Sequence, residues 1–167
     1  VGEAMAIGRS FPEALQKALR SLERKESEFD WDISKSREEL LNEMRVPTER
    51  RLHQVQQALH FGASIDEVNR RTGIDPWFLT QISQINAIAL QIKELNELDL
   101  AHLRLAKSFG FSDIQIGKLR NLSQNEIRAF RHKLDVRPVY KTVDTCAGEF
   151  EAYTPYHYSS YDQESEV

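Results

Sequence analysis

Helix-start signals recur across the middle of this chain at short intervals, and they constrain its fold more than any other feature. Four serines are each followed three residues later by Glu or Gln, the capping-box pattern that satisfies free amides in a first helical turn. These pairs are Ser36 with Glu39, Ser64 with Glu67, Ser112 with Gln115, and Ser123 with Glu126. Asp75-Pro76 adds an N-cap followed by proline at the first helical position.

Helix-stop signals alternate with these starts, since glycine stands at three positions where a C-cap is expected: Gly62, Gly73 and Gly110. One such signal is weak, but a series at intervals of about ten residues predicts a compact all-helical domain. We expect this domain over residues 36–135. The predicted fold class is therefore mainly α, a bundle of short helices with short extended segments at both ends.

One helix is predicted to be longer than the others and to run from Pro76 to about Leu95. Its main apolar stripe is Phe78, Ile82, Ile85, Ala89 and Ile92. Leu79 and Leu90 lie on a separate side, about 110° away at 100° per residue. A helix that is apolar on more than one side is either central to its bundle or shared with a partner. We expect a central helix, and Leu79 and Leu90 are the candidate interface residues if its second side faces a partner.

The N-terminal residues predict a strand followed by a helix. Residues 1–8 form a short apolar stretch typical of a strand, with no partner strand following it, so we expect a piece of a larger protein. Ser10 and Glu13 then form another capping box. Spacings of four, three and four predict one apolar helical face: Phe11, Leu15, Ala18 and Leu22.

The segments on either side of the predicted domain differ from it in composition. Residues 23–35 are charged and weakly periodic, which predicts a linker, although Phe29, Trp31 and Ile33 alternate and are expected to pack against the helices. All five tyrosines follow residue 139, and Val139–Val143 is typical of a strand. Residues 136–167 are therefore predicted to be an extended, aromatic linker.

Composition excludes a membrane span. The least polar long stretch, Trp77 to Ile92, carries no charge, but six polar residues interrupt it. A span needs about 20 predominantly apolar residues, so we expect no membrane contact. The N-terminus lacks the pattern of a secretory leader, and Cys146 is the only cysteine. A single cysteine excludes an internal disulfide and favours an intracellular origin. We expect a cytoplasmic protein, with an organelle as the alternative.

A search for chemistry yields no catalytic, cofactor-binding or metal-binding residue. The five histidines lack the i,i+4 spacing of a zinc site and have no cysteine nearby. His53 and His60, seven residues apart, are better explained as two histidines at the solvent edge. Cys146 is better explained as a structural thiol than as a nucleophile. Nucleophile-elbow, phosphate-loop and dinucleotide-binding patterns are all missing from the sequence.

Residues 104–137 carry eight Lys or Arg against three Asp or Glu, although the net charge of the chain is −4. Within them, two predicted short helices meet at Leu122-Ser123, which resembles a helix-turn-helix DNA reader. Such a basic surface could neutralise phosphates. The alternative is a generic helical hairpin with a solvated basic side, which short capped helices produce readily.

The two ends of the chain carry the longest motifs. Residues 1–20 (VGEAMAIGRSFPEALQKALR) resemble the segment that closes the first ATP-grasp half of the large subunit of carbamoyl phosphate synthetase. Residues 137–161 (RPVYKTVDTCAGEFEAYTPYHYSSY) are similar to the stretch that leads into its second half. Residues 74–79 (IDPWFL) and 110–113 (GFSD) match the helical middle of that family. The resemblance covers nearly the whole chain in the right order and is weakest over residues 23–50.

This resemblance implies a place within a large ligase. Residues 1–22 would end the first ATP-grasp half, 23–35 would be a linker, 36–135 the oligomerisation domain, and 136–167 the link to the second half. The parent would make carbamoyl phosphate from bicarbonate, ammonia taken from glutamine, and two ATP with Mg²⁺ or Mn²⁺, for arginine and pyrimidine synthesis. Implied partners are the rest of the large subunit, a glutaminase subunit or domain, and a second copy. No catalytic residue carries over, so the segment alone is expected to be inactive.

Overall fold

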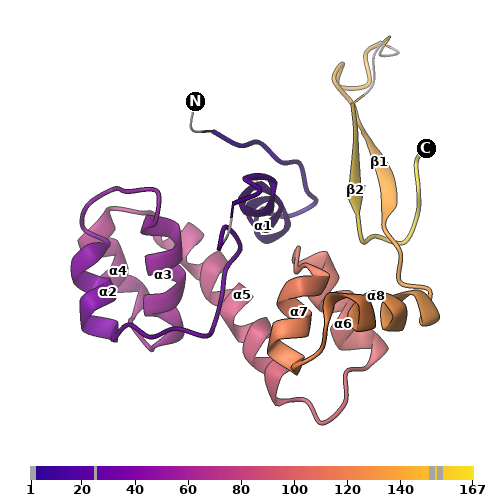
Figure 1. Ribbon diagram of the computed structural model, residues 1–167. Helices are drawn as coiled ribbons and strands as arrows, with labels where there is room; N and C mark the ends of the chain where they lie inside the picture. The colour runs from indigo at the N-terminus through magenta and orange to yellow at the C-terminus, as the bar shows by residue number, and fades with distance from the viewer. Residues whose placement is uncertain (1–2, 25, 151–152, 154–155) are drawn as a thin grey trace.

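The computed structural model describes residues 3–24, 26–150, 153 and 156–167, and within them it is mainly helical (Figure 1). The helices are α1 (Phe11–Ser21), α2 (Arg37–Glu43), α3 (Arg51–His60), α4 (Ile65–Thr72), α5 (Pro76–Glu94), α6 (Leu100–Ser108), α7 (Asp113–Arg120) and α8 (Gln124–Lys133). The strands are β1 (Val139–Val143) and β2 (Tyr156–Ser160). The predicted fold class is confirmed.

The predicted helix starts in the middle of the chain are confirmed at atomic detail. At Ser36, Ser64, Ser112 and Ser123 the hydroxyl accepts from the backbone N–H three residues on, and that residue's side chain accepts from the serine N–H. Among the predicted stops, Gly73 is itself the left-handed C-cap of α4. Gly62 and Gly110 are also left-handed, one residue beyond the caps of α3 and α6. Local patterns thus set where these helices begin and end.

Helix α1 departs from its predicted cap and face. The Ser10 hydroxyl accepts from the Glu13 N–H (3.4 Å), but the Glu13 carboxylate accepts from the Arg9 N–H (2.7 Å) instead of closing the box on Ser10. The predicted apolar face is also shifted, since Leu22 is exposed while Leu19 is buried. Glu13 is 1% exposed, so α1 buries a carboxylate that the capping-box pattern places at the surface.

Residues 3–8 do not form the predicted strand. They have no regular secondary structure, and Met5 is exposed. No described strand pairs with this segment, and an extended segment without a partner has no ladder of backbone hydrogen bonds. Residues 1–2 of the predicted strand lie outside the described residues.

The segment predicted to pack against the helices, 23–35, contributes to the core. Phe29 is 2% exposed, and Trp31 is buried with its ring stacked on Phe111 (centroids 5.5 Å apart). The Trp31 indole Nε1 donates to the Asn86 Oδ1 of α5 at 2.8 Å. Ile33, the third residue of the alternation, is half-buried.

Helix α5 is central, as predicted. It crosses the molecule between the α2–α4 group and the α6–α8 group (Figure 1). Leu79 and Ile82 in its first half belong to a core cluster with residues of α2, α3 and α4. Ile85 and Ile92 in its second half belong to another cluster, which includes residues of α1, α6, α7 and α8. One helix therefore supplies both cores.

The C-terminal part forms a hairpin that projects from the helices (Figure 1). Predicted strand Val139–Val143 is present as β1, and it pairs antiparallel with β2, from Val139 opposite Ser160 to Val143 opposite Tyr156. The final residues fold back on β1, where the Glu166 N–H donates to the Tyr140 carbonyl at 2.8 Å. Lys141 of β1 is buried between the Asp162 and Glu166 carboxylates.

Candidate functional site

The two predicted interface leucines of α5 have different surroundings. Leu79 is 0% exposed and packs against α2–α4, whereas Leu90 is 45% exposed. Leu79 is buried in the helical body, so it does not meet the condition of exposure on which its role as an interface candidate depends. The two leucines lie on the same side of α5, but Leu79 in the first half of the helix belongs to the core cluster shared with α2, α3 and α4. Leu90 and the neighbouring exposed Ala87 remain as an apolar face on the second half.

Phe78 was predicted to lie on the buried stripe of α5, but it is 42% exposed. It stands in the first turn, where Phe78, Trp77 and Phe11 all contact one another edge to face, with ring centroids 5.0–5.6 Å apart. Trp77 is 54% exposed. This aromatic cluster joins the starts of α1 and α5, and sequence reasoning missed it. Two adjacent aromatic residues after a helix cap were its only local signal.

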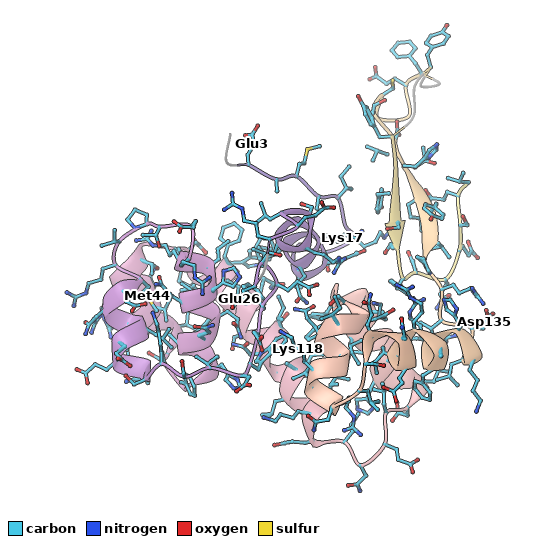
Figure 2. All side chains as sticks on the ribbon, viewed as in Figure 1. Glu3, Lys17, Glu26, Met44, Lys118 and Asp135 are labelled. Atoms are coloured by element: carbon cyan, nitrogen blue, oxygen red, sulfur yellow. The ribbon has the colours of Figure 1, made fainter. Side chains whose placement is uncertain are left out.

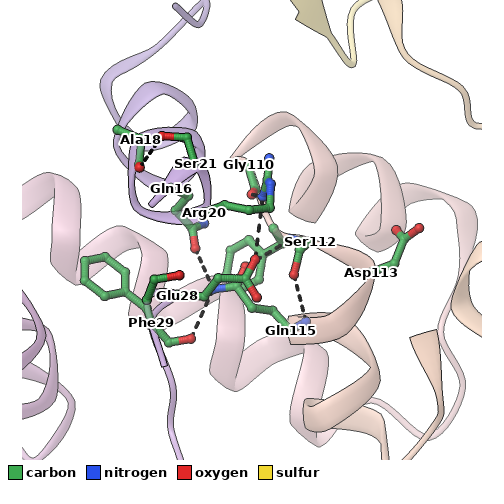
Figure 3. Close-up of polar contacts among 12 residues, drawn as sticks. Gln16, Ala18, Arg20, Ser21, Glu28, Phe29, Gly110, Ser112, Asp113 and Gln115 are labelled. Atoms are coloured by element: carbon green, nitrogen blue, oxygen red, sulfur yellow. Dashed lines mark hydrogen bonds and ion pairs between the residues drawn. The ribbon is translucent and has the colours of Figure 1, made fainter. Parts of the chain in front are cut away.

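A buried amide network joins α1, the 23–35 segment and α7 (Figure 3). The Gln115 amide nitrogen donates to the Gln16 Oε1 (2.9 Å) and to the Phe29 carbonyl (3.1 Å). Gln16 in turn donates to the Phe109 carbonyl at 2.8 Å. The Arg20 guanidinium donates to the Gly110 carbonyl at 3.1 Å. These bonds fix α1 on the helical body.

Asp113 is the centre of a buried ionic cluster. Its Oδ1 lies 3.0 Å from the Lys107 Nζ, and its Oδ2 lies 3.0 Å from an Arg131 terminal nitrogen. All three side chains are more than nine-tenths buried. Burial lowers the pKa of Lys107 to about 8, so the ammonium still carries its charge at neutral pH. Local patterns did not indicate this cluster, because its members come from α6, α7 and α8.

The basic segment 104–137 contains the end of α6 and a helical hairpin, since α7 and α8 pack together across the Leu122-Ser123 turn. Five of its eight cationic side chains bind within the protein. Lys107 and Arg131 pair with Asp113, Lys118 pairs with Asp30, Arg137 pairs with Asp135, and Arg120 donates to backbone carbonyls including those of Ile92 and Asn96. These charges are already neutralised or hydrogen-bonded, so the structure favours the generic hairpin over a phosphate-binding surface.

The described residues contain no group of three His, Cys, Asp or Glu placed to hold a metal ion. His53, predicted at the solvent edge, is instead buried against the Phe29 ring, and its Nε2 lies 3.0 Å from the Ser27 carbonyl. Burial lowers the pKa of His53 in spite of that contact. Cys146 is half-buried near the hairpin tip. Across the described part of the chain, no helix is both long and apolar enough to cross a membrane.

Comparison with known proteins identifies one family across the chain. The family model described as "Carbamoyl-phosphate synthetase large chain, oligomerisation domain" matches residues 3–135. The carbamoyl phosphate synthase large chain of Clavibacter michiganensis is 57% identical over 168 residues, covering 100% of this chain and 15% of that protein. Those of Micrococcus luteus and Renibacterium salmoninarum are 58% and 55% identical, with the same coverage. None of these relatives supports the nucleic-acid alternative.

Proposed function

The chain belongs to the family of carbamoyl-phosphate synthetase large-chain oligomerisation domains, and from this we propose that it is a non-catalytic spacer and self-association module of such a large chain. The chain spans about 15% of the length of the curated relatives it matches. Similarity along the whole chain, including both of its ends, is the observation that carries this proposal.

The parent protein is proposed to be an ATP-dependent, glutamine-hydrolysing carbamoyl-phosphate synthase of the cytoplasm. It would use bicarbonate, glutamine-derived ammonia and two ATP with Mg²⁺ or Mn²⁺, and its product would serve arginine and pyrimidine synthesis. In this arrangement residues 1–22 end one ATP-grasp half, 23–35 link it to the oligomerisation domain at 36–135, and 136–167 lead into the other half. The rest of the large chain and a glutaminase are its proposed partners, and residues 1–167 alone would be inactive.

The exposed second half of α5 is the surface that we propose for self-association. Leu90 is a large apolar side chain that lies open on the longest helix, beside exposed Ala87. A few side chains that become fully covered near the centre of an interface contribute most of its affinity. A lysine there would place a charge inside the interface, where its desolvation opposes association.

Leu90→Lys in the complete large chain is expected to weaken self-association by at least about tenfold, or about 1.4 kcal/mol. Sedimentation velocity over a concentration series measures this shift towards the monomer. Gln91→Lys is the matched control, because Gln91 is exposed on the same helix and already polar. Circular dichroism should show unchanged helicity in both variants, since a half-exposed position tolerates lysine.

Two results would contradict this interface. Equal sedimentation of the Leu90 and Gln91 variants would place the self-association surface elsewhere. Loss of helicity in Leu90→Lys alone would show that Leu90 belongs to the core, as Leu79 does.

A further inference from the structure

The two ends of the described chain are bound to each other through helix α1. The groups that bind them are Glu13 and Lys17 of α1, Ser159 and Ser160 at the end of β2, and Tyr161 directly after it. We name this set the end clamp. Lys17 points from α1 towards the strands (Figure 2). The clamp contacts join residues 142 and 147 positions apart in the sequence.

Lys17 holds three parts of the chain at one ammonium group. Its Nζ donates to the Ile7 carbonyl (2.9 Å) and to the Ser159 carbonyl of β2, and it lies 3.0 Å from the Glu13 Oε1. Two of the three N–H donors of the ammonium are thus used in hydrogen bonds to carbonyls, and its contact with Glu13 is an ion pair. The segment that leads to α1, α1 itself and β2 therefore share one charged group.

Glu13 is the buried counterpart of Lys17 and is 1% exposed. Its Oε2 accepts from the Arg9 backbone N–H at 2.7 Å and from the Ser160 hydroxyl at 3.4 Å. A buried carboxylate is stable only when its charge and hydrogen bonds are satisfied, and here the donors come from both ends of the chain. Separating the two ends would thus leave Glu13 short of partners.

Tyr161 attaches the end of β2 to the helical body. Its ring lies 4.9 Å from the Lys107 Nζ and 5.7 Å from the Arg131 Cζ, the two cations that pair with Asp113. Cations over an aromatic face attract it most when they are shielded from water, as these are. On the other side, α1 is seated closely on the α6–α7 turn, where a Cβ at Gly110 would lie 3.0 Å from the Glu13 backbone. Little room remains for α1 to slide.

We propose that the end clamp makes the segment before α1 and the segment after β2 move as one unit. For the complete large chain, this proposal rests on the proposed function, because there the two segments would lead to the two catalytic halves. A displacement on one side then reaches the other through two side chains of α1. The much longer path through α2–α8 is bypassed.

Hydrogen exchange of the complete large chain, resolved by mass spectrometry, tests the clamp. Lys17→Met and Glu13→Gln on α1 are expected to speed the exchange of Tyr156–Tyr161 amides by about tenfold, because coupled contacts are lost without a change in β1 or β2. Exchange in α5 should stay within about twofold. Glu97→Gln is the matched control, because Glu97 is exposed between α5 and α6. It should change the exchange rates of neither β2 nor α5.

Coupling is reciprocal, so Ser160→Ala should in turn speed exchange over residues 3–10. Unchanged exchange of β2 in both α1 variants would overturn the clamp. Equal acceleration in α5 and β2 would also overturn it, because the effect would then be a general loss of stability. Failure of the proposed function would show separately, as a complete large chain that does not self-associate at any concentration in sedimentation velocity, and would leave these exchange rates as they are.

Discussion

Replacing Asp113 with asparagine is expected to lower the free energy of unfolding by about 3–5 kcal/mol. Asparagine keeps the shape of the side chain but leaves the Lys107 and Arg131 cations buried without a counter-charge. Both cationic side chains are less than a tenth exposed, so water cannot replace the lost carboxylate. Arg131 would also lose the contacts that its Nε and terminal nitrogen both make to this carboxylate.

Urea unfolding followed by circular dichroism measures this loss. Asp135→Asn is the matched control, because Asp135 pairs with Arg137 at 3.4 Å on the exposed surface. Exposed pairs contribute little, so the control should change stability by less than about 1 kcal/mol. Similar losses in the two variants would mean that the buried cluster contributes no more than a surface pair.

Acid should reduce the difference between wild type and Asp113→Asn. Burial raises the pKa of the Asp113 carboxyl, but the Arg131 hydrogen bond and the Lys107 charge outweigh it and hold the pKa below 3.8. A folded-state pKa below the unfolded one means that the stabilisation is complete above the unfolded pKa and is lost as the pH falls through the folded pKa. The unfolding free energies of the two proteins should therefore converge as the pH falls below 3.8.

Phe29→Ala is expected to lower the free energy of unfolding by about 3–5 kcal/mol, although Phe29 lies in a segment that sequence patterns place between domains. The ring is 2% exposed and makes an edge-to-face contact with His53 of α3, with centroids 5.7 Å apart. Its removal opens a cavity that the helices around it cannot close, since Gln115 also holds the Phe29 carbonyl. Thermal and urea unfolding both measure the loss.

Ile33→Ala is the matched control for the same segment. Ile33 is half-buried, so its truncation removes less buried apolar area and should lower the free energy of unfolding by about 1 kcal/mol. If Phe29→Ala costs no more than Ile33→Ala, residues 23–35 are attached to the surface as a linker and are not part of the core.

Sequence patterns predicted what depends on neighbouring residues. The serine capping boxes at Ser36, Ser64, Ser112 and Ser123 gave helix starts correctly, because both partners of each box lie within four residues. The full length of α5 was predictable for the same reason, from the Asp75 cap and a continuous apolar period.

Positions that depend on distant partners were not predictable in this way. A helical wheel places Leu79 and Leu90 on one side of α5, but only the packed helices determine which half of that side is covered. Glu13 fits a capping box by spacing, yet its partner Ser160 lies 147 residues away. The Asp113 cluster likewise draws on three helices. A charge count over 104–137 therefore overstated the free positive charge.

The contact between α1 and β2 also bears on how this domain can vary. The chain leaves α1, passes through seven further helices in the described residues, and returns to the same helix at Ser159 and Ser160. Domains whose chain enters and leaves at one place accept insertions and replacements without disturbing their neighbours. The free energy needed to close a loop between two fixed points rises only slowly with the length of the loop. Helices could therefore be added to or removed from this body in evolution, or a short linker substituted for it, while the flanking pieces keep the same spacing.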